Sequence, residues 1–103
     1  MTVGDVLAAL RARPAAVRCD ELTSMLGALG FVVREGSSGG HRRYQHQNVK
    51  TSEGTPLMGS FDGGHGRNSV VNINYVRKAI KLIEWYEEEL QVYLHGKSGG
   101  GGT

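Results

Sequence analysis

The sequence is poor in cysteine and has no long apolar run. Cys19 is the only cysteine among 103 residues, so one chain can form neither an internal disulfide nor a zinc site built from several cysteines. No segment approaches the roughly 20 apolar residues that span a bilayer. The apolar run near the N-terminus is interrupted by Asp5 and is too short for a secretory signal. These absences predict a cytoplasmic protein that is not inserted in a membrane.

Charge of one sign is also scarce over the whole chain. Twelve basic and ten acidic residues give a net charge of +2 with neutral histidines, which is too small to indicate a nucleic-acid-binding protein by itself. The charges are unevenly distributed, however. Residues 34–50 contain four basic residues against Glu35 alone, and residues 84–89 contain four glutamates and no basic residue. This pattern predicts a basic patch and an acidic helix face, although a solvated surface would explain both equally well.

The length and the hydrophobic fraction of 39% favour one globular domain. Hydrophobic periodicity predicts helix, helix, three strands, helix, and hence an α+β fold with a small three-stranded antiparallel sheet covered on one face by helices. Without the extra N-terminal helix the order is α-β-β-β-α, which is that of double-stranded-RNA-binding domains. The expected segments are 2–13, 20–29, 31–33, 41–47, 55–61 and 75–94. We expect one domain over 1–94 with its core in 20–94, and a flexible Gly-rich tail over 95–103.

Capping signals mark several of these helix ends. Thr2 and Asp5 have the spacing of a capping box, and Asp20 is a good N-cap for the second helix. Gly30 stands where a left-handed residue ends that helix. Asn72 or Asn74 can cap the last helix, whose basic residues come early and whose glutamates come late. This charge order opposes the helix dipole, so packing or a partner must offset a cost of about 0.3–1 kcal/mol per charge.

The segment "GSSGGHRRYQHQ", residues 36–47, places a histidine at the exit of a Gly/Ser loop and follows it with two arginines. Side chains alternate across a strand, so His41 and Arg43 should share one face while Arg42, Tyr44 and His46 share the other. Arg43 is therefore the more probable neighbour of His41 on that face. His46 is expected to be structural or simply exposed.

The same region resembles the HicA family of bacterial toxins. The resemblance rests on a helix that ends in Gly30-Phe31, a strand, the Gly/Ser turn of residues 36–40 that leads into His41, and an aromatic residue, Tyr44, soon after. It covers residues 20–94 and is strongest over 20–46. The chain looks like a divergent member, because Gly40 replaces the Ser or Thr that often precedes the histidine, the turn is long, and an N-terminal helix is added.

The resemblance implies both a fold and an activity. Members of this family fold like a double-stranded-RNA-binding domain, cleave messenger RNA as endoribonucleases, and are held inactive by a HicB-type antitoxin encoded alongside. The motif histidine is catalytic in the family, so the resemblance assigns that role to His41 here. The implied partners are messenger RNA and the antitoxin.

The residue types fit metal-independent RNA cleavage, which needs neither a metal ion nor an organic cofactor. A base must remove the proton of a 2′-hydroxyl, and histidine suits this role because its pKa is about 6.5. Guanidinium groups can bind phosphate oxygens in pairs, which suits Arg43 and, less directly, Arg42, and the ammonium group of Lys50 could add a further positive charge. The backbone N–H groups of Gly39 and Gly40 could also approach a phosphate closely.

The proton donor for the leaving 5′-oxygen is less evident. His65 lies in a second Gly-rich loop and could reach the same site as a general acid, although a surface histidine in a loop would look the same. A zinc site from His41, His46, His65 and Asp62 has no supporting ligand spacing. Cys19 precedes a helix, which could lower its pKa, but a small residue at a helix start is the simpler interpretation.

Two other functional classes stay open. The chain could be a non-catalytic module that recognises RNA by its shape and uses the same basic patch. It could instead be a protein-interaction domain that uses the acidic last helix. Trp85 and Tyr86 in that helix suggest one core residue and one interface residue. Steep weakening of binding with salt would indicate RNA rather than protein binding.

Overall fold

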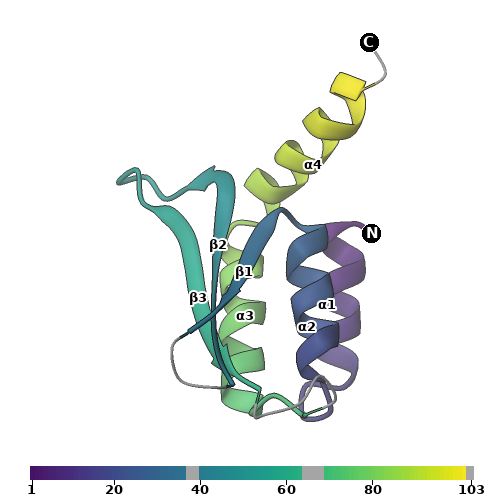
Figure 1. Ribbon diagram of the computed structural model, residues 1–103. Coiled ribbons are helices and arrows are strands. Elements are labelled where there is room, and N and C mark those ends of the chain that lie inside the picture. Colours follow the sequence, from purple (N-terminus) through teal and green to yellow (C-terminus); the bar gives the residue numbers. More distant parts are fainter. Residues whose placement is uncertain (37–39, 64–68, 102–103) are drawn as a thin grey trace.

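The protein is described by a computed structural model, in which residues 1–36, 40–63 and 69–101 are described. The α+β fold with a three-stranded antiparallel sheet is confirmed, and the sheet has the strand order β1-β2-β3. Four helices accompany it (Figure 1). The elements are α1 Val3–Ala12, α2 Cys19–Ala28, β1 Phe31–Glu35, β2 His41–Lys50, β3 Pro56–Asp62, α3 Ile73–Trp85 and α4 Glu87–Gly101.

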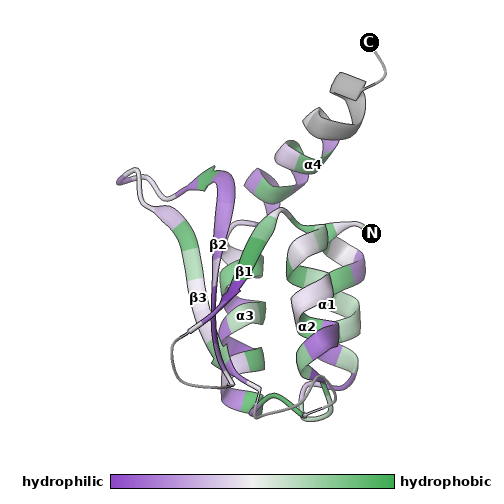
Figure 2. Ribbon diagram, viewed as in Figure 1, coloured by the Kyte–Doolittle hydropathy of each residue, from purple (hydrophilic) through white to green (hydrophobic). Residues whose placement is uncertain are grey.

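One face of the sheet is covered by helices and the other is open (Figure 1). Side chains alternate along β2, where Tyr44 and His46 are buried beneath the helices while Arg43 and Gln45 are exposed on the other side. This alternation confirms the faces predicted from the sequence. Figure 2 shows that β2 is strongly hydrophilic over much of its length, as expected of a strand with one open face.

Helix α1 belongs to the core rather than being an accessory. Its residues Val3, Val6 and Leu10 are fully buried. The predicted capping box is confirmed: Thr2 N–H donates to the Asp5 carboxylate at 2.9 Å, and Asp5 N–H donates to the Thr2 hydroxyl oxygen at 3.1 Å. The hydrogen bond from the Thr2 backbone N–H to the carboxylate is the main cause that lowers the pKa of Asp5. The N-terminal helix therefore completes the hydrophobic layer under the sheet.

Helix α2 begins earlier than the sequence predicted. The N-cap is Arg18 and not Asp20, which lies in the first turn beside Glu21. The reason is tertiary: Arg18 forms an isolated antiparallel bridge with Val70, and Cys19 N–H donates to the Ser69 carbonyl at 2.8 Å. Pairing with a distant segment fixes the chain just before the helix, and this outweighs the local preference of Asp for the N-cap.

The turn from α2 into β1 depends on a close approach to β2. Gly30 has φ +100°, as predicted for the left-handed residue after this helix. A Cβ atom at Gly30 would lie 2.6 Å from His46 Nε2 and 2.6 Å from Tyr93 Cε2. Both the backbone conformation and the lack of space therefore require glycine at this position.

His46 is a structural histidine of the covered face. It is 2% exposed, and its Nε2 donates to the Leu29 carbonyl at 2.7 Å. Its Nδ1 accepts from Asn48 N–H at 3.0 Å and from Val49 N–H at 2.9 Å. The register between β2 and β3 shifts between Gln45 and Lys50, so these N–H groups lie at an irregularity of the ladder. His46 thus satisfies backbone groups that the distorted strand leaves unpaired.

The last helix was predicted to be continuous over 75–94, and the structure shows two helices instead. α3 starts at Ile73, where Asn72 accepts from Asn74 N–H at 2.9 Å, so Asn72 is the cap. The helix breaks at Tyr86. The break places three glutamates of the acidic segment, Glu87 to Glu89, in the first turn of α4. Carboxylates are favourable there, so the break relieves part of the unfavourable charge order expected of one long helix, although Glu84 stays in the last turn of α3.

The segment 95–103 was predicted to be a flexible tail. α4 extends to Gly101, residues 102 and 103 lie outside the described residues, and the flexibility of the segment stays a prediction. Leu90 is buried at the base of α4. Among the helices in the described part of the chain, none is both long enough and apolar enough to cross a membrane.

Candidate active site on the open sheet face

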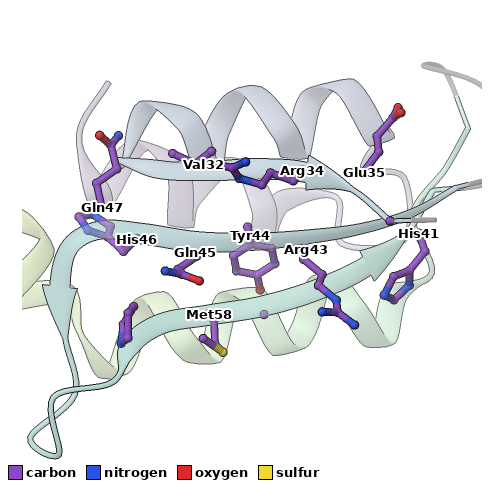
Figure 3. A pocket seen from close by; sticks show the side chains of 13 residues that line it. Val32, Arg34, Glu35, His41, Arg43, Tyr44, Gln45, His46, Gln47 and Met58 are labelled. Atoms are coloured by element: carbon purple, nitrogen blue, oxygen red, sulfur yellow. The ribbon is translucent and has the colours of Figure 1, made fainter. Parts of the chain in front are cut away.

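The open face of the sheet is hollowed into a groove of about 970 Å³. It runs over all three strands and includes His41 and Arg43 of β2, Arg34 of β1 and Met58 of β3 (Figure 3). The strand register arranges its side chains in rows across the sheet. Successive rows are two residues apart along a strand, which corresponds to about 7 Å.

The first row contains the predicted catalytic histidine. His41 pairs with Asp62 across β2 and β3, and its Nδ1 lies 2.8 Å from Asp62 Oδ1. The His41 side chain is 33% exposed. A carboxylate only accepts hydrogen bonds, so this contact places the proton on Nδ1. In the neutral ring Nε2 then carries the free lone pair that a general base requires.

Asp62 is itself held from a second direction. The hydroxyl of Tyr75, on α3, donates to Asp62 Oδ2 at 3.4 Å while Oδ1 accepts from His41. Gly36 N–H donates to the His41 carbonyl at 2.7 Å, and the His41 ring lies close over Gly36. Side-chain and backbone contacts therefore fix the orientation of His41. Within the described residues, its Nε2 has no hydrogen bond.

The second row is cationic. Arg34 pairs with Arg43 across β1 and β2, and Arg43 pairs with Ser60 of β3. Both arginines are exposed, and neither forms a salt bridge with the acidic residues that the structure describes. Figure 3 shows Arg43 on the same side of the sheet as His41. Two unpaired guanidinium groups next to a histidine form a site suited to phosphate.

Arg42 does not point into this site. Its side chain is 15% exposed, donates to the Gly40 carbonyl at 3.3 Å, and forms an ion pair with Glu35 at 3.5 Å. Its guanidinium lies near Gly63, close to the thiol of Cys19. Arg42 is thus placed on the covered side of the sheet, where it supports the end of the hairpin rather than facing a ligand beside His41.

The other predicted phosphate-binding residues are more widely spread. Lys50 is at the far end of β2, nine residues from His41, where it lines a second pocket with Glu88 and Glu89. Gly40 directly precedes His41 with φ +87°, and its carbonyl accepts from Gly63 N–H at 2.9 Å. Gly39 and the candidate general acid His65 lie outside the described residues.

Other side chains that could take part in catalysis are buried or lie on the opposite face of the sheet. His46 lies on the opposite face from His41, and burial lowers its pKa. Cys19 is buried, and burial raises the pKa of its thiol despite the nearby guanidinium of Arg42. Burial raises the pKa of Tyr44 to about 12, so its hydroxyl stays protonated. No cluster of three His, Cys, Asp or Glu residues that could hold a metal is present in the described ranges.

Two residues of the site were not selected from the sequence as partners of His41. Arg34 could have been found, because alternation in the first strand places it on the same face as Val32, opposite Phe31 and Val33. Asp62 was considered only as a metal ligand. Its pairing with His41 depends on the register of β2 and β3, which the sequence does not show directly.

Comparison of the chain with protein-family models, with characterised proteins and with solved structures gave no match. The geometry of the open face and the sequence motif are therefore the grounds for a functional assignment.

Proposed function

We propose that this chain is a metal-independent endoribonuclease of the HicA type. In this proposal it is the toxin of a type II toxin–antitoxin pair, cleaves messenger RNA in the cytoplasm, and is inhibited by a HicB-type antitoxin that covers His41. The observation that carries the proposal is the His41–Asp62 contact beside two unpaired arginines on an open sheet. The element order α2-β1-β2-β3-α3, which is that of double-stranded-RNA-binding domains, supports the family resemblance.

The chemistry follows from the orientation of His41. Nε2 removes the proton of a ribose 2′-hydroxyl, and the 2′-oxygen forms a bond to the adjacent phosphorus. Asp62 holds the ring in the reactive tautomer and stabilises the imidazolium that results. Arg43 and Arg34 stabilise the negative charge that grows on the phosphoryl oxygens. The bond from phosphorus to the 5′-oxygen breaks, and that oxygen takes a proton from a donor, for which His65 stays the prediction.

This mechanism predicts a particular set of products. The upstream fragment ends in a 2′,3′-cyclic phosphate and the downstream fragment begins with a 5′-hydroxyl. Cleavage proceeds in EDTA, because the attacking hydroxyl belongs to the RNA and is activated by His41 rather than by a metal-bound water. Analysis of fragment ends by mass spectrometry distinguishes these products from the 5′-phosphate ends of metal-dependent nucleases.

The decisive experiment measures cleavage in EDTA and RNA binding on the same samples. We expect His41→Ala to lower the cleavage rate by about 10²–10⁴-fold while binding changes little. Asp62→Asn should lower it by up to about 10⁴-fold, because the amide can donate to Nδ1 and so favour the tautomer that protonates Nε2. His95→Ala is the matched control, since His95 is an exposed histidine on α4, away from the groove.

Three outcomes would change the assignment. Cleavage that His41→Ala leaves intact would remove His41 from the mechanism. Cleavage that is lost in EDTA and restored by a divalent cation would replace the mechanism with a metal-dependent one. RNA binding without cleavage by the wild-type chain would leave a non-catalytic RNA-binding module.

A further inference from the structure

The groove continues beyond the catalytic and cationic rows into a third row of different chemistry. Val32 of β1, Gln45 of β2 and Met58 of β3 are aligned by the strand register. Val32 is 37% exposed and Met58 is 51% exposed, although both are apolar. The amide of Gln45 lies between them and forms no hydrogen bond within the described residues. An amide without a protein partner in the described part of the chain, between two exposed apolar side chains, is a surface suited to a ligand with both a flat apolar face and polar edges.

A nucleobase has this combination. Its face can pack on the side chains of Met58 and Val32, and its edge presents donors and acceptors that one amide can match in pairs. Gln47, at the same end of the groove, donates its amide N–H to the Gly30 carbonyl at 3.3 Å, which leaves its amide oxygen as an acceptor. The third row therefore offers the Gln45 amide toward a base edge and two apolar groups toward its face, and Gln47 lies at the same end of the groove.

We propose that this third row, Val32, Gln45 and Met58, binds an unpaired base of single-stranded RNA next to the cleavage site and sets the base preference. The location of this base next to the cleavage site rests on the proposed function, whereas the binding of a base rests on the geometry of the sheet face alone. In this arrangement the scissile phosphate, on the 5′ side of that base's nucleotide, lies on Arg34 and Arg43, and the preceding sugar, whose 2′-hydroxyl attacks this phosphate, reaches His41.

A duplex does not fit this surface. The bases of an A-form helix are stacked inside it, and its exterior presents phosphates and hydroxyls, so Met58 and Val32 would be buried against polar groups. The 2′-oxygen also has to attack in line with the leaving 5′-oxygen, and the regular A-form backbone does not provide this alignment. A splayed single strand supplies both an accessible base and a free backbone.

Charge on the groove agrees with this occupant. Of the side chains that line it, Glu35 is the only acidic one among the described residues, and it is engaged in the ion pair with Arg42. The exposed guanidinium groups of Arg34 and Arg43 give the middle of the groove a positive potential. The positively charged second row lies between the row of His41 and the third row with its apolar and amide side chains. This order matches the alternation of phosphate and base along one RNA strand.

The test uses the full chain carrying His41→Ala, so that RNA is bound but not cut. The probes are fluorescein-labelled RNAs of about 12 nucleotides: single-stranded oligo-A, oligo-C and oligo-U, and one duplex of equal length. Binding is followed by fluorescence anisotropy over a range of salt concentrations. The variants are Gln45→Ala and Met58→Ala in the third row and Arg43→Ala in the second. Gln91→Ala and Val92→Ala on α4 are the matched controls, and both positions are exposed and outside the groove.

We expect the single strands to bind more tightly than the duplex. Met58→Ala should weaken single-strand binding without changing its salt dependence, since the lost contact is to a base and not to a phosphate. Gln45→Ala should reduce the differences between oligo-A, oligo-C and oligo-U. Arg43→Ala should weaken all single strands about equally and lower the salt slope by about one. The two α4 variants should bind like the parent.

The inference is overturned if the duplex binds as tightly as the single strands, or if the Gln45 and Met58 variants bind every probe like the parent. In either case the cleavage assigned to His41 could still hold, because it is measured separately on the chain with His41 intact. Conversely, a wild-type chain that binds single strands as expected but never cuts them would end the ribonuclease proposal and leave this inference standing.

Discussion

His41 and His46 lie five residues apart on β2, in opposite surroundings. His41 is on the open face, where its side chain is 33% exposed and one ring nitrogen is held by Asp62. His46 is on the covered face, is 2% exposed, and uses both ring nitrogens for backbone groups. One strand thus carries a histidine suited to proton transfer and another suited to holding the fold. Exposure and a free lone pair, rather than residue type, separate the two roles.

The comparison extends to the whole sheet. Its covered face is closed by aromatic packing, with the Phe31 ring 5.4 Å from the Tyr44 ring and 4.9 Å from the His46 ring, both nearly perpendicular. Its open face is formed by rows of charged, amide and apolar side chains. Substitutions on the covered face should therefore change the stability of the fold. Under the proposed function, substitutions on the open face should change the binding or the cleavage of RNA.

The largest expected effect comes from His46→Ala. The substitution removes a buried ring and leaves the Leu29 carbonyl and the N–H groups of Asn48 and Val49 without their partner. The buried Leu29 carbonyl left unsatisfied costs about 1–3 kcal/mol, and the lost ring adds a cavity, whereas the partly buried N–H groups of Asn48 and Val49 can turn to water at a smaller cost. We expect the free energy of unfolding, measured with urea, to fall by about 3 kcal/mol or more.

His41→Ala is the matched variant for that comparison. Because His41 is partly exposed and its one side-chain partner, Asp62, can turn to water, the free energy of unfolding should change by less than about 1 kcal/mol. Equal losses of stability in the two variants would contradict the division of roles between the faces.

The pH dependence of stability sharpens the comparison. Burial lowers the pKa of His46 below its usual 6.5 in the folded chain, although its hydrogen bond to Leu29 opposes the shift. The unfolded chain therefore binds a proton first as the pH falls. The contribution of His46 to stability is complete above about pH 6.5 and is lost as the pH falls toward the folded pKa, by at most about 1.4 kcal/mol per pH unit.

This slope can be isolated with one variant. Urea midpoints are measured between about pH 8 and pH 5 for the wild type and for His46→Phe, which keeps an aromatic ring but does not titrate. The difference between the urea midpoints of the wild type and of His46→Phe should become smaller as the pH falls below about 6.5. A difference that stays constant over this window would show that His46 does not cause the pH dependence.

The part of this architecture that follows from local rules could be predicted from the sequence. Strand alternation separated His41 and Arg43 from Tyr44 and His46, and the Thr2 capping box was recognised from spacing alone. Such features depend on residues a few positions apart, where geometry is nearly fixed by the type of secondary structure.

The features that were missed depend on distant pairs. The partner of His41 follows from the register of two strands, and that register includes an irregularity after Gln45. The start of α2 follows from the bridge between Arg18 and Val70. The break at Tyr86 moves Glu87 to Glu89 to the start of a second helix, whereas the hydrophobic periodicity alone predicts one continuous helix. Local patterns predict the helices and strands, whereas the site depends on contacts between helices and strands that are distant in the sequence.

Among the substitutions on the covered face, the smallest expected effect concerns the contact between α4 and that face. The ring of Tyr93 lies 4.6 Å from the ring of His46, nearly perpendicular to it. Tyr93→Leu keeps an apolar side chain but loses this ring contact, so the free energy of unfolding should fall by about 0.5–1.5 kcal/mol. Water reaches His46 more easily in this variant, so its pKa should rise toward 6.5 and the pH slope should flatten. RNA cleavage should be unchanged, because His41 and its partners lie on the other face. A variant with unaltered stability but weaker cleavage would mean that α4 acts on the open face, and the separation of the two faces would then fail.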